Sequence, residues 1–141
     1  MPTEYVVAKE SHALSSVLMQ IDNCECIECV VNPGSQIITM LEEVCHDFSL
    51  AYNPSIKLNM QLANGGMDQS LGLAHNVPCQ ISPIMLYFQL HIICSPAYDI
   101  LLGHPFNVLT ESTVKNYSNK DQTITINDPN SMQSIVVPTV H

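Results

Sequence analysis

The chain has 141 residues, of which 46% are hydrophobic, so it is long enough and apolar enough to fold as one domain. It contains 13 acidic residues against 4 lysines and no arginine, which gives a net charge of −9 at pH 7. This balance argues against nucleic-acid binding, which needs clustered Lys and Arg, and leaves no arginine for a phosphate site.

Membrane and secreted classes also find no support in the sequence. No N-terminal stretch combines a basic start with an apolar run. The longest apolar stretch, Ile84 to Cys94, is interrupted by Gln89 and His91 and is too short to cross a bilayer. We therefore expect a cytoplasmic or other intracellular protein without a membrane partner, in which the six cysteines stay reduced.

The first part of the chain predicts an arm followed by two strands. Residues 1–13 are mostly polar and are expected to form an N-terminal arm, whereas residues 14–141 are expected to form a single domain. Leu14 to Ile21 predicts a strand, Asp22-Asn23 a turn, and Cys24 to Val31 a second strand.

Three cysteines of the second predicted strand, Cys24, Cys26 and Cys29, could suggest a zinc site. Zinc needs about four converging ligands, and in an extended strand Cys24 and Cys26 face one side while Cys29 faces the other. No Cys or His pair follows at zinc-finger spacing. The sequence therefore favours small buried apolar side chains, and it predicts no metal and no other cofactor.

A polar turn, Asn32-Pro33-Gly34-Ser35-Gln36, separates the second strand from the apolar run Ile37 to Met40. Asn, Pro, Gly and Ser are the commonest turn residues, so the stretch taken alone is equally well explained as a surface turn. Leu41 to Phe48 then has the apolar spacing of a short amphipathic helix, with His46 on its polar side.

Two hairpins follow. Ile56 to Leu62 alternates strictly between apolar and polar residues and predicts a strand with one buried face. Asn64-Gly65-Gly66 predicts the hairpin tip, because these residues accept positive φ, and Asp68 to His75 predicts the return strand. The second hairpin pairs Val77–Ile81 with Ile84–Ile93.

The last third of the chain predicts a buried strand, a helix and a closing hairpin. The strand is Ile100-Leu101-Leu102, bounded by Gly103, and Pro105 begins the helix because proline in a first turn loses no hydrogen bond. Three apolar side chains are expected to pack inward from this helix: Phe106, Leu109 and Val114. Gln122 to Asn127 and Ser134 to Val137 predict the closing hairpin, so the fold is expected to be mainly β with one or two short helices.

Two stretches give the chain a resemblance to the retroviral-type aspartic proteases, the retropepsins. Cys29-Val30-Val31 running into Asn32-Pro33-Gly34-Ser35 resembles their active-site loop, in which apolar residues precede Asp-Ser/Thr-Gly and a small residue. Tyr98-Asp99-Ile100-Leu101-Leu102-Gly103-His104-Pro105-Phe106 resembles their apolar-apolar-Gly motif before the C-terminal helix. The resemblance extends from about Leu14 to Pro138 and is nearest to the protease region of fungal LTR-retrotransposon Gag-Pol polyproteins.

The resemblance implies a closed retropepsin-like β-barrel with a flap hairpin. It also implies a homodimer, because this chain has one such loop and the family's site lies on a two-fold axis to which each half supplies one carboxylate. Two such carboxylates share one proton and activate a water molecule. In the family the C-terminal strands interlock in the dimer; here the closing hairpin could do so or cover an edge of its own sheet.

Asn32 stands where the resemblance places the catalytic aspartate. An amide does not titrate near neutral pH and cannot take a proton from water, so the chain is expected to be nearly inactive until Asn32→Asp restores the acid. Asn32 is either an engineered change or a natural loss, and the sequence leaves both open. Pro33 is a second departure, because the usual Ser/Thr hydroxyl bonds across the dimer axis and proline offers neither hydroxyl nor N–H.

The resemblance also implies roles for the residues around Asn32, Pro33 and Gly34. Peptide contacts would come from the loop and the flap, through Ser35, Gln36, Ala63, Asn64, Gly65, Gly66 and Met67. Support beneath the loop would come from Ile100, Leu101, Leu102, Gly103 and His104. His104 replaces an arginine common in relatives, and a His104–Gln36 contact would be weaker and pH-dependent, so we expect a weak dimer, testable by sedimentation; an exposed His104 without a role is the alternative.

The leading hypothesis is an aspartic endopeptidase domain that processes a retrotransposon polyprotein. It would act as a homodimer on extended peptides, and Asn32 would make this chain inactive. A peptide-binding pseudoprotease and a dimerisation module without catalysis are the alternatives. Other hydrolase classes lack their motifs: Ser35 lies in no Gly-x-Ser-x-Gly turn, and Cys45 and His46 are adjacent, so they point apart on a helix.

Overall fold

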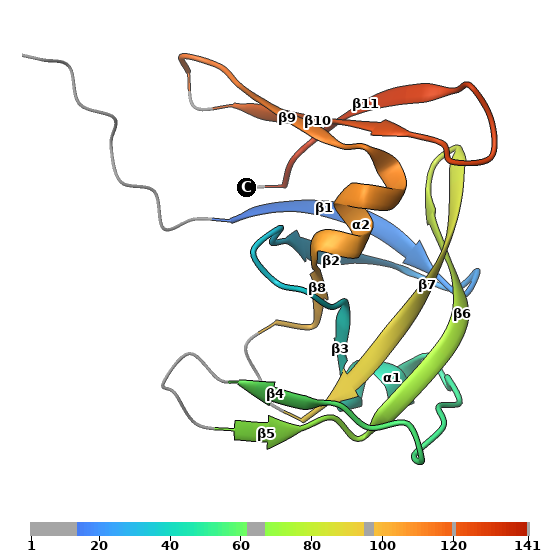
Figure 1. Cartoon of the computed structure of the whole chain (residues 1–141). Coiled ribbons are helices and arrows are strands. Elements are labelled where there is room, and N and C mark those ends of the chain that lie inside the picture. Colours follow the sequence, from blue (N-terminus) through green and yellow to red (C-terminus); the bar gives the residue numbers. More distant parts are fainter. Residues whose placement is uncertain (1–13, 62–66, 95–97, 120, 141) are drawn as a thin grey trace, which may run out of the picture.

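The computed structural model describes residues 14–61, 67–94, 98–119 and 121–140. In these ranges the chain is mainly β-structure with two short helices, which confirms the predicted fold class. Six strands close into a barrel (Figure 1). They are β1 (Ser15–Ile21), β2 (Cys26–Val31), β3 (Thr39–Leu41), β6 (Gly72–Ile81), β7 (Ile84–Ile93) and β8 (Ile100–Leu102).

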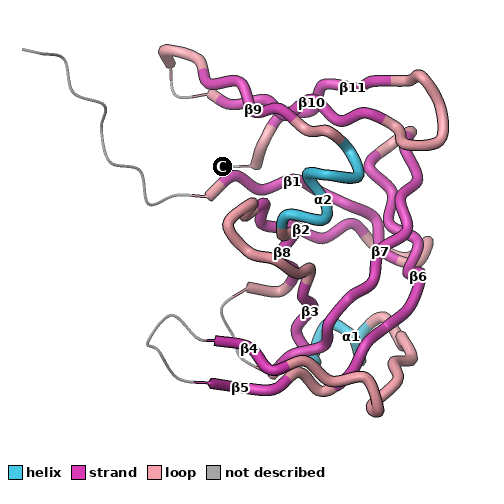
Figure 2. The backbone as a smooth tube through the Cα atoms, viewed as in Figure 1, coloured by secondary structure: helices cyan, strands magenta, loops and turns pink. Residues whose placement is uncertain are grey.

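The barrel order is β1-β2-β8-β3-β7-β6, and β6 pairs with β1 to close it. The other strands are β4 (Asn59–Gln61), β5 (Met67–Gln69), β9 (Thr113–Asn116), β10 (Gln122–Asn127) and β11 (Ser134–Pro138). β4 and β5 form a separate two-stranded sheet, and the last three form a sheet in the order β11-β10-β9. The helices are α1 (Glu42–Asp47), after β3, and α2 (His104–Thr110), after β8 (Figure 2).

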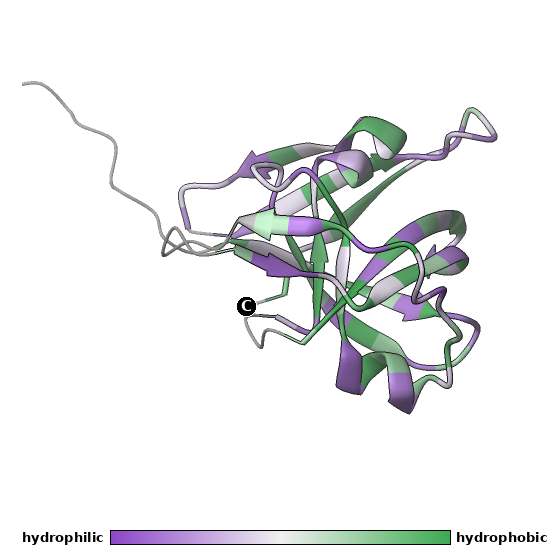
Figure 3. Cartoon of the chain, turned by 60° about the horizontal axis from the view of Figure 1, so that its bottom comes forward, coloured by the Kyte–Doolittle hydropathy of each residue, from purple (hydrophilic) through white to green (hydrophobic). Residues whose placement is uncertain are grey.

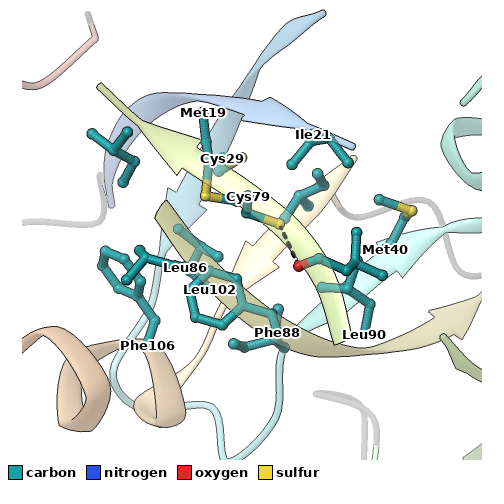
Figure 4. Packing of buried hydrophobic residues seen from close by; sticks show 14 of the residues in the cluster. Met19, Ile21, Cys29, Met40, Cys79, Leu86, Phe88, Leu90, Leu102 and Phe106 are labelled. Carbon is teal, nitrogen blue, oxygen red and sulfur yellow. Dashed lines mark hydrogen bonds between the residues drawn. The ribbon is translucent and has the colours of Figure 1, made fainter. Parts of the chain in front are cut away.

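Side chains that alternate along the strands fill the barrel. Along β7, every second residue from Ile84 to Ile92 is buried and the residues between them face outward. The same alternation makes the strands change between hydrophobic and hydrophilic colours along their length (Figure 3). Phe106 of α2 enters this core and packs edge-to-face on Phe88, with ring centroids 6.0 Å apart (Figure 4). This aromatic pair fixes α2 on the barrel.

Cys29 and Cys79 lie inside the barrel (Figure 4). Burial raises the pKa of both thiols, that of Cys79 to about 12, so both stay protonated and act as small apolar residues. Cys79 Sγ donates to the Val77 carbonyl at 3.5 Å (Figure 4). Cys24 and Cys26 are exposed, so the prediction of buried side chains is wrong for these two.

The turn between β1 and β2 is longer than the sequence predicts. Asp22 and Asn23 adopt φ angles of 51° and 58°. The Cys24 N–H then donates to the Ile21 carbonyl at 2.9 Å. This bond keeps Cys24 in the turn, so β2 begins at Cys26 and not at Cys24.

The strand predicted at Ile56–Leu62 is also shorter, because β4 begins only at Asn59. Asn53 forms an isolated bridge with Leu73, and its carbonyl accepts the Ile56 N–H at 3.3 Å. These bonds hold the residues before β4 in a turn against β6. Leu62 lies outside the described residues.

The two strands predicted at Asp68–His75 and Val77–Ile81 are divided differently. β5 ends at Gln69, whereas β6 runs unbroken across the predicted gap. Asn76 lies at a register shift in β6 with a φ of 51°. It exchanges two hydrogen bonds with the Gln89 side chain, of 3.1 and 2.7 Å, and these link β6 to β7 across the irregularity.

The residues after α2 correct one core prediction. The helix ends at Thr110, and Glu111 adopts a left-handed conformation with a φ of 44°. Val114 therefore belongs to β9, which the sequence did not predict, and it is exposed instead of packing inward from the helix. Phe106 is buried and Leu109 is half-buried against the core, as predicted.

The closing hairpin packs on its own barrel. Ile124 and Ile126 of β10 are fully buried in the same core as the barrel strands. Beyond β11, the Val140 N–H donates to the Ser16 carbonyl of β1 at 2.8 Å. The hairpin and the segment after it thus cover part of the chain's own β1 edge, one of the two roles expected for it. The arm predicted at residues 1–13 lies outside the described residues.

Candidate active site

The loop from Asn32 to Ile38 is suspended between two barrel strands. It leaves β2 and enters β3, and β8 lies between these strands, parallel to β2 and antiparallel to β3. Its central residue, Leu101, is opposite both Val30 of β2 and Thr39 of β3. The three strands form one continuous support, with β8 beneath the loop.

Asn32 is fixed at three points. Its N–H donates to the Leu102 carbonyl of β8 at 2.9 Å, and its carbonyl accepts the Ser35 N–H at 3.1 Å. The side-chain oxygen, Oδ1, accepts the Gly34 N–H at 3.1 Å. Because Oδ1 accepts this hydrogen bond within the loop, the Nδ2 amide hydrogens are the remaining polar group of the side chain. The side chain is half-buried. Asn32 therefore offers a donor and no base.

Gly103 allows β8 and α2 to pass close beneath the loop. A Cβ atom at this position would lie 2.0 Å from the Ile37 carbonyl oxygen and 2.8 Å from the Ser35 carbonyl oxygen. Both contacts are to backbone, which cannot turn aside as a side chain could. Directly after Gly103, the His104 N–H donates to the Ser35 carbonyl at 2.7 Å. The glycine is thus required by a close backbone crossing.

His104 and Gln36 are both exposed and line the same hollow, whose volume is about 510 Å³. Among the described residues no hydrogen bond joins their side chains, so the contact expected between them is not formed within this chain. The exposed Tyr87 and Val108 line the same hollow.

His91 is a residue of the loop support that the sequence did not identify. Its backbone N–H donates to the Ile38 carbonyl at 2.9 Å, which ties the end of the loop to β7. Burial lowers the pKa of its imidazole, and Nδ1 has no hydrogen-bond partner among the described residues. The apolar residues on either side of His91 in β7 gave a strand signal but no signal for this role.

The hairpin predicted as the flap is present as β4 and β5. Gln61 is opposite Met67 at its outer end, and Met67 is 67% exposed. The predicted contact residues Ala63, Asn64, Gly65 and Gly66 lie outside the described residues.

The base of this hairpin is anchored by Ser70, which is buried. Ser70 Oγ accepts the Leu58 N–H at 2.8 Å, and the Ser70 N–H donates to the Leu58 carbonyl at 2.8 Å. Just beyond, a Cβ at Gly72 would lie 2.5 Å from the Asn53 carbonyl oxygen and 2.5 Å from Tyr52 Cδ2. The sequence signal for the close approach of Gly72 to Asn53 and Tyr52 was a glycine inside a strand pattern.

A second hollow, of about 640 Å³, lies away from the loop beside α1 and the β1–β2 turn. Its acidic lining consists of Glu25, Glu43, Asp47 and Asp99, and Cys24 and Cys26 also reach it. Nowhere in the described ranges do three or more His, Cys, Asp or Glu side chains gather in a way that could hold a metal ion. Neither of the two described helices is long and apolar enough to cross a membrane.

Comparison with known proteins gives a structural match and no sequence match. No family model and no curated protein sequence matches the chain. The crystal structure of the retroviral protease-like domain of Ddi1 from Leishmania major superimposes with a TM-score of 0.66, covering 93% of this chain and 97% of that one at 16% identity. At this identity the likeness shows the fold alone. The retropepsin-like fold predicted from the two motifs is therefore confirmed.

Proposed function

We propose that this chain is a retropepsin-like aspartic endopeptidase domain in which Asn32 has replaced the catalytic acid. It forms a homodimer with the loop on the two-fold axis, grips an extended peptide beneath two β4–β5 flaps, and cleaves it only when position 32 carries a carboxylate. Its origin is a retrotransposon polyprotein that is processed inside the cell.

The observation that carries this proposal is the crossing of β8 and Gly103 beneath the Asn32 loop. An ordinary surface turn needs no such support. Here the backbone N–H of Asn32 is bonded to β8, the Ser35 carbonyl is bonded to α2, and the close approach excludes any side chain at position 103. Such a construction holds one side chain in a fixed orientation, which is what a catalytic carboxylate requires.

The chemistry follows from replacing the Asn32 amide by a carboxylate of the same shape. One carboxylate oxygen would keep the bond from the Gly34 N–H, now seen at Oδ1. The other would face the partner's carboxylate across the axis. Two such groups share one proton, so one takes a proton from water while the other donates one to the scissile amide. Asn32 can perform neither step.

A peptide-binding pseudoprotease is the second candidate. It is favoured by one observation: Asn32 already satisfies the loop, because Oδ1 accepts the Gly34 N–H and leaves a donor for a peptide carbonyl. Such a protein would bind extended chains by backbone pairing without cutting them. A dimerisation module would self-associate and bind no peptide.

A paired cleavage assay separates these candidates. The chain, its Asn32→Asp variant and an Asn32→Ala control are incubated with a peptide library between pH 4 and 7, and products are identified by mass spectrometry. The proposal expects products from Asn32→Asp alone, blocked by pepstatin-type inhibitors. Peptide binding without products from any of the three forms would establish the pseudoprotease instead.

A further inference from the structure

Four hydrogen bonds, to three other residues, meet at Ser35. Its N–H donates to the Asn32 carbonyl at 3.1 Å, and its carbonyl accepts the His104 N–H at 2.7 Å. Its hydroxyl, Oγ, donates to the Ile37 carbonyl at 3.1 Å and lies 3.5 Å from the Ile37 N–H. Ser35 thus joins the turn of Asn32, the end of the loop and the first residue of α2.

The Ile37 carbonyl that accepts the Ser35 hydroxyl is the same carbonyl that packs on Gly103. A Cβ at Gly103 would lie 2.0 Å from its oxygen, so this carbonyl and the glycine are in tight contact. The hydroxyl fixes the direction of the carbonyl, and the carbonyl in turn sets how closely the loop approaches β8. The position of the Asn32 turn therefore depends on the bond between the Ser35 hydroxyl and the Ile37 carbonyl.

Pro33 contributes no side-chain hydrogen bond to the loop. A serine or threonine at position 33 could contribute a hydroxyl to hold the loop, whereas proline has neither a hydroxyl nor an N–H. Pro33 and Gly34 are both exposed and contribute no side-chain hydrogen bond among the described residues. The hydroxyl next in the chain is that of Ser35, and it is directed into the loop.

We propose that Ser35 is the positioning residue of this site, whose hydroxyl holds the Asn32 turn in place from within a single protomer. This inference rests on the proposed function, because it assigns the support of the same residue 32. The sequence predicted that Ser35 contacts the peptide. Here Ser35 instead orients residue 32, which would contact the peptide. One consequence is that the loop keeps its shape in a protomer without a partner.

The first test uses the unmodified chain and needs no cleavage. In ¹⁵N-labelled protein, Ser35→Ala is expected to raise the exchange rate of the Ile37 amide about tenfold, because the Ile37 N–H loses Ser35 Oγ as its acceptor. It should also broaden the Asn32 side-chain NH₂ signals, because the Ile37 carbonyl loses the Ser35 hydroxyl that fixes it. The amides of β6 and β7 should keep their exchange rates. Ser35→Thr, which retains the hydroxyl, should resemble the parent chain. Ser55→Ala, which removes an exposed hydroxyl, is the matched control.

The second test uses the Asn32→Asp background. Adding Ser35→Ala is expected to lower kcat about tenfold and to change KM less than about twofold, because the carboxylate is misplaced while the peptide groove is intact. Ser35→Thr should restore kcat. Unchanged Asn32 and Ile37 signals in Ser35→Ala would overturn the inference. A lack of cleavage by Asn32→Asp itself would remove the proposed function but leave the spectroscopic test decisive for Ser35.

Discussion

The loop around Asn32 and the β4–β5 hairpin lie on the same side of the barrel, but they are held in opposite ways (Figure 1). The loop is bonded to β8 at Asn32, to α2 at Ser35 and to β7 at Ile38. The described strands of the hairpin pair with each other, and Leu58 and Ser70 close its base by two further hydrogen bonds.

This difference matches two different tasks. A group that takes part in proton transfer must be held within a fraction of an ångström, which a loop bonded to three elements can achieve. A lid over a bound peptide must open and close, which a two-stranded hairpin anchored at its base can do. Substitutions in the loop should therefore change the loop's conformation and kcat. Substitutions in the hairpin should instead change peptide binding and KM.

The largest effect is expected from Gly103→Ala. Its Cβ would meet the Ile37 backbone at 2.0 Å, so we expect a loss of about 3 kcal/mol or more in the free energy of unfolding. Gly34→Ala is the matched control, because there a Cβ lies 3.2 Å from Asn32 Oδ1 and should cost about 1 kcal/mol or less. Urea denaturation measures both. Equal costs would show that the crossing under the loop is not tight.

A smaller effect is expected at the base of the hairpin. Ser70→Ala leaves the half-buried Leu58 N–H without its side-chain acceptor and should destabilise the chain by about 1 kcal/mol. In the Asn32→Asp background it should raise KM and leave kcat nearly unchanged, because the lid loses its anchor while the loop is intact. Ser55→Ala is again the control. A fall in kcat without a rise in KM would contradict the expected difference between the hairpin and the loop.

The smallest effect concerns His91, at the end of the loop. Burial lowers its pKa below the ordinary value of 6.5, so the unfolded chain takes up the proton first when the pH falls. The stabilisation is fully present above about pH 6.5 and is lost as the pH falls through the folded-state pKa. His91→Gln should reduce the difference in unfolding free energy between pH 7.5 and pH 5. An unchanged or larger difference in the variant would contradict this.

Local patterns were enough to predict many of the strands, both inside and outside the barrel. The strict alternation in Gln122–Asn127 and the apolar strand Ile100–Leu102 gave elements that the structure reproduces. The failures are at places where distant contacts decide. The strand predicted from Ile56 starts three residues late because Asn53 is bonded to Leu73, and Val114 is exposed because α2 ends at Thr110.

The site itself stays a prediction, and the sequence indicated only part of how its loop is held. Two motifs identified the loop and the glycine beneath it, since a turn chemistry and an apolar-apolar-Gly pattern are visible in sequence. The bond from the Ser35 hydroxyl to Ile37 and the tie from His91 to Ile38 could not be predicted, because they depend on how the loop folds back on itself and on β7. The roles of the flap-tip residues 63–66 stay predictions.

The most direct test of a shared site on a two-fold axis is a mixing experiment. Asn32→Asp chains are mixed with unmodified chains at constant total concentration, left to exchange partners, and assayed for cleavage. If each active site needs one carboxylate from each chain, activity follows the square of the variant's fraction, so an equal mixture keeps roughly a quarter of the activity of the pure variant. Roughly half of the activity, the linear result expected if each chain acts alone, would contradict the account.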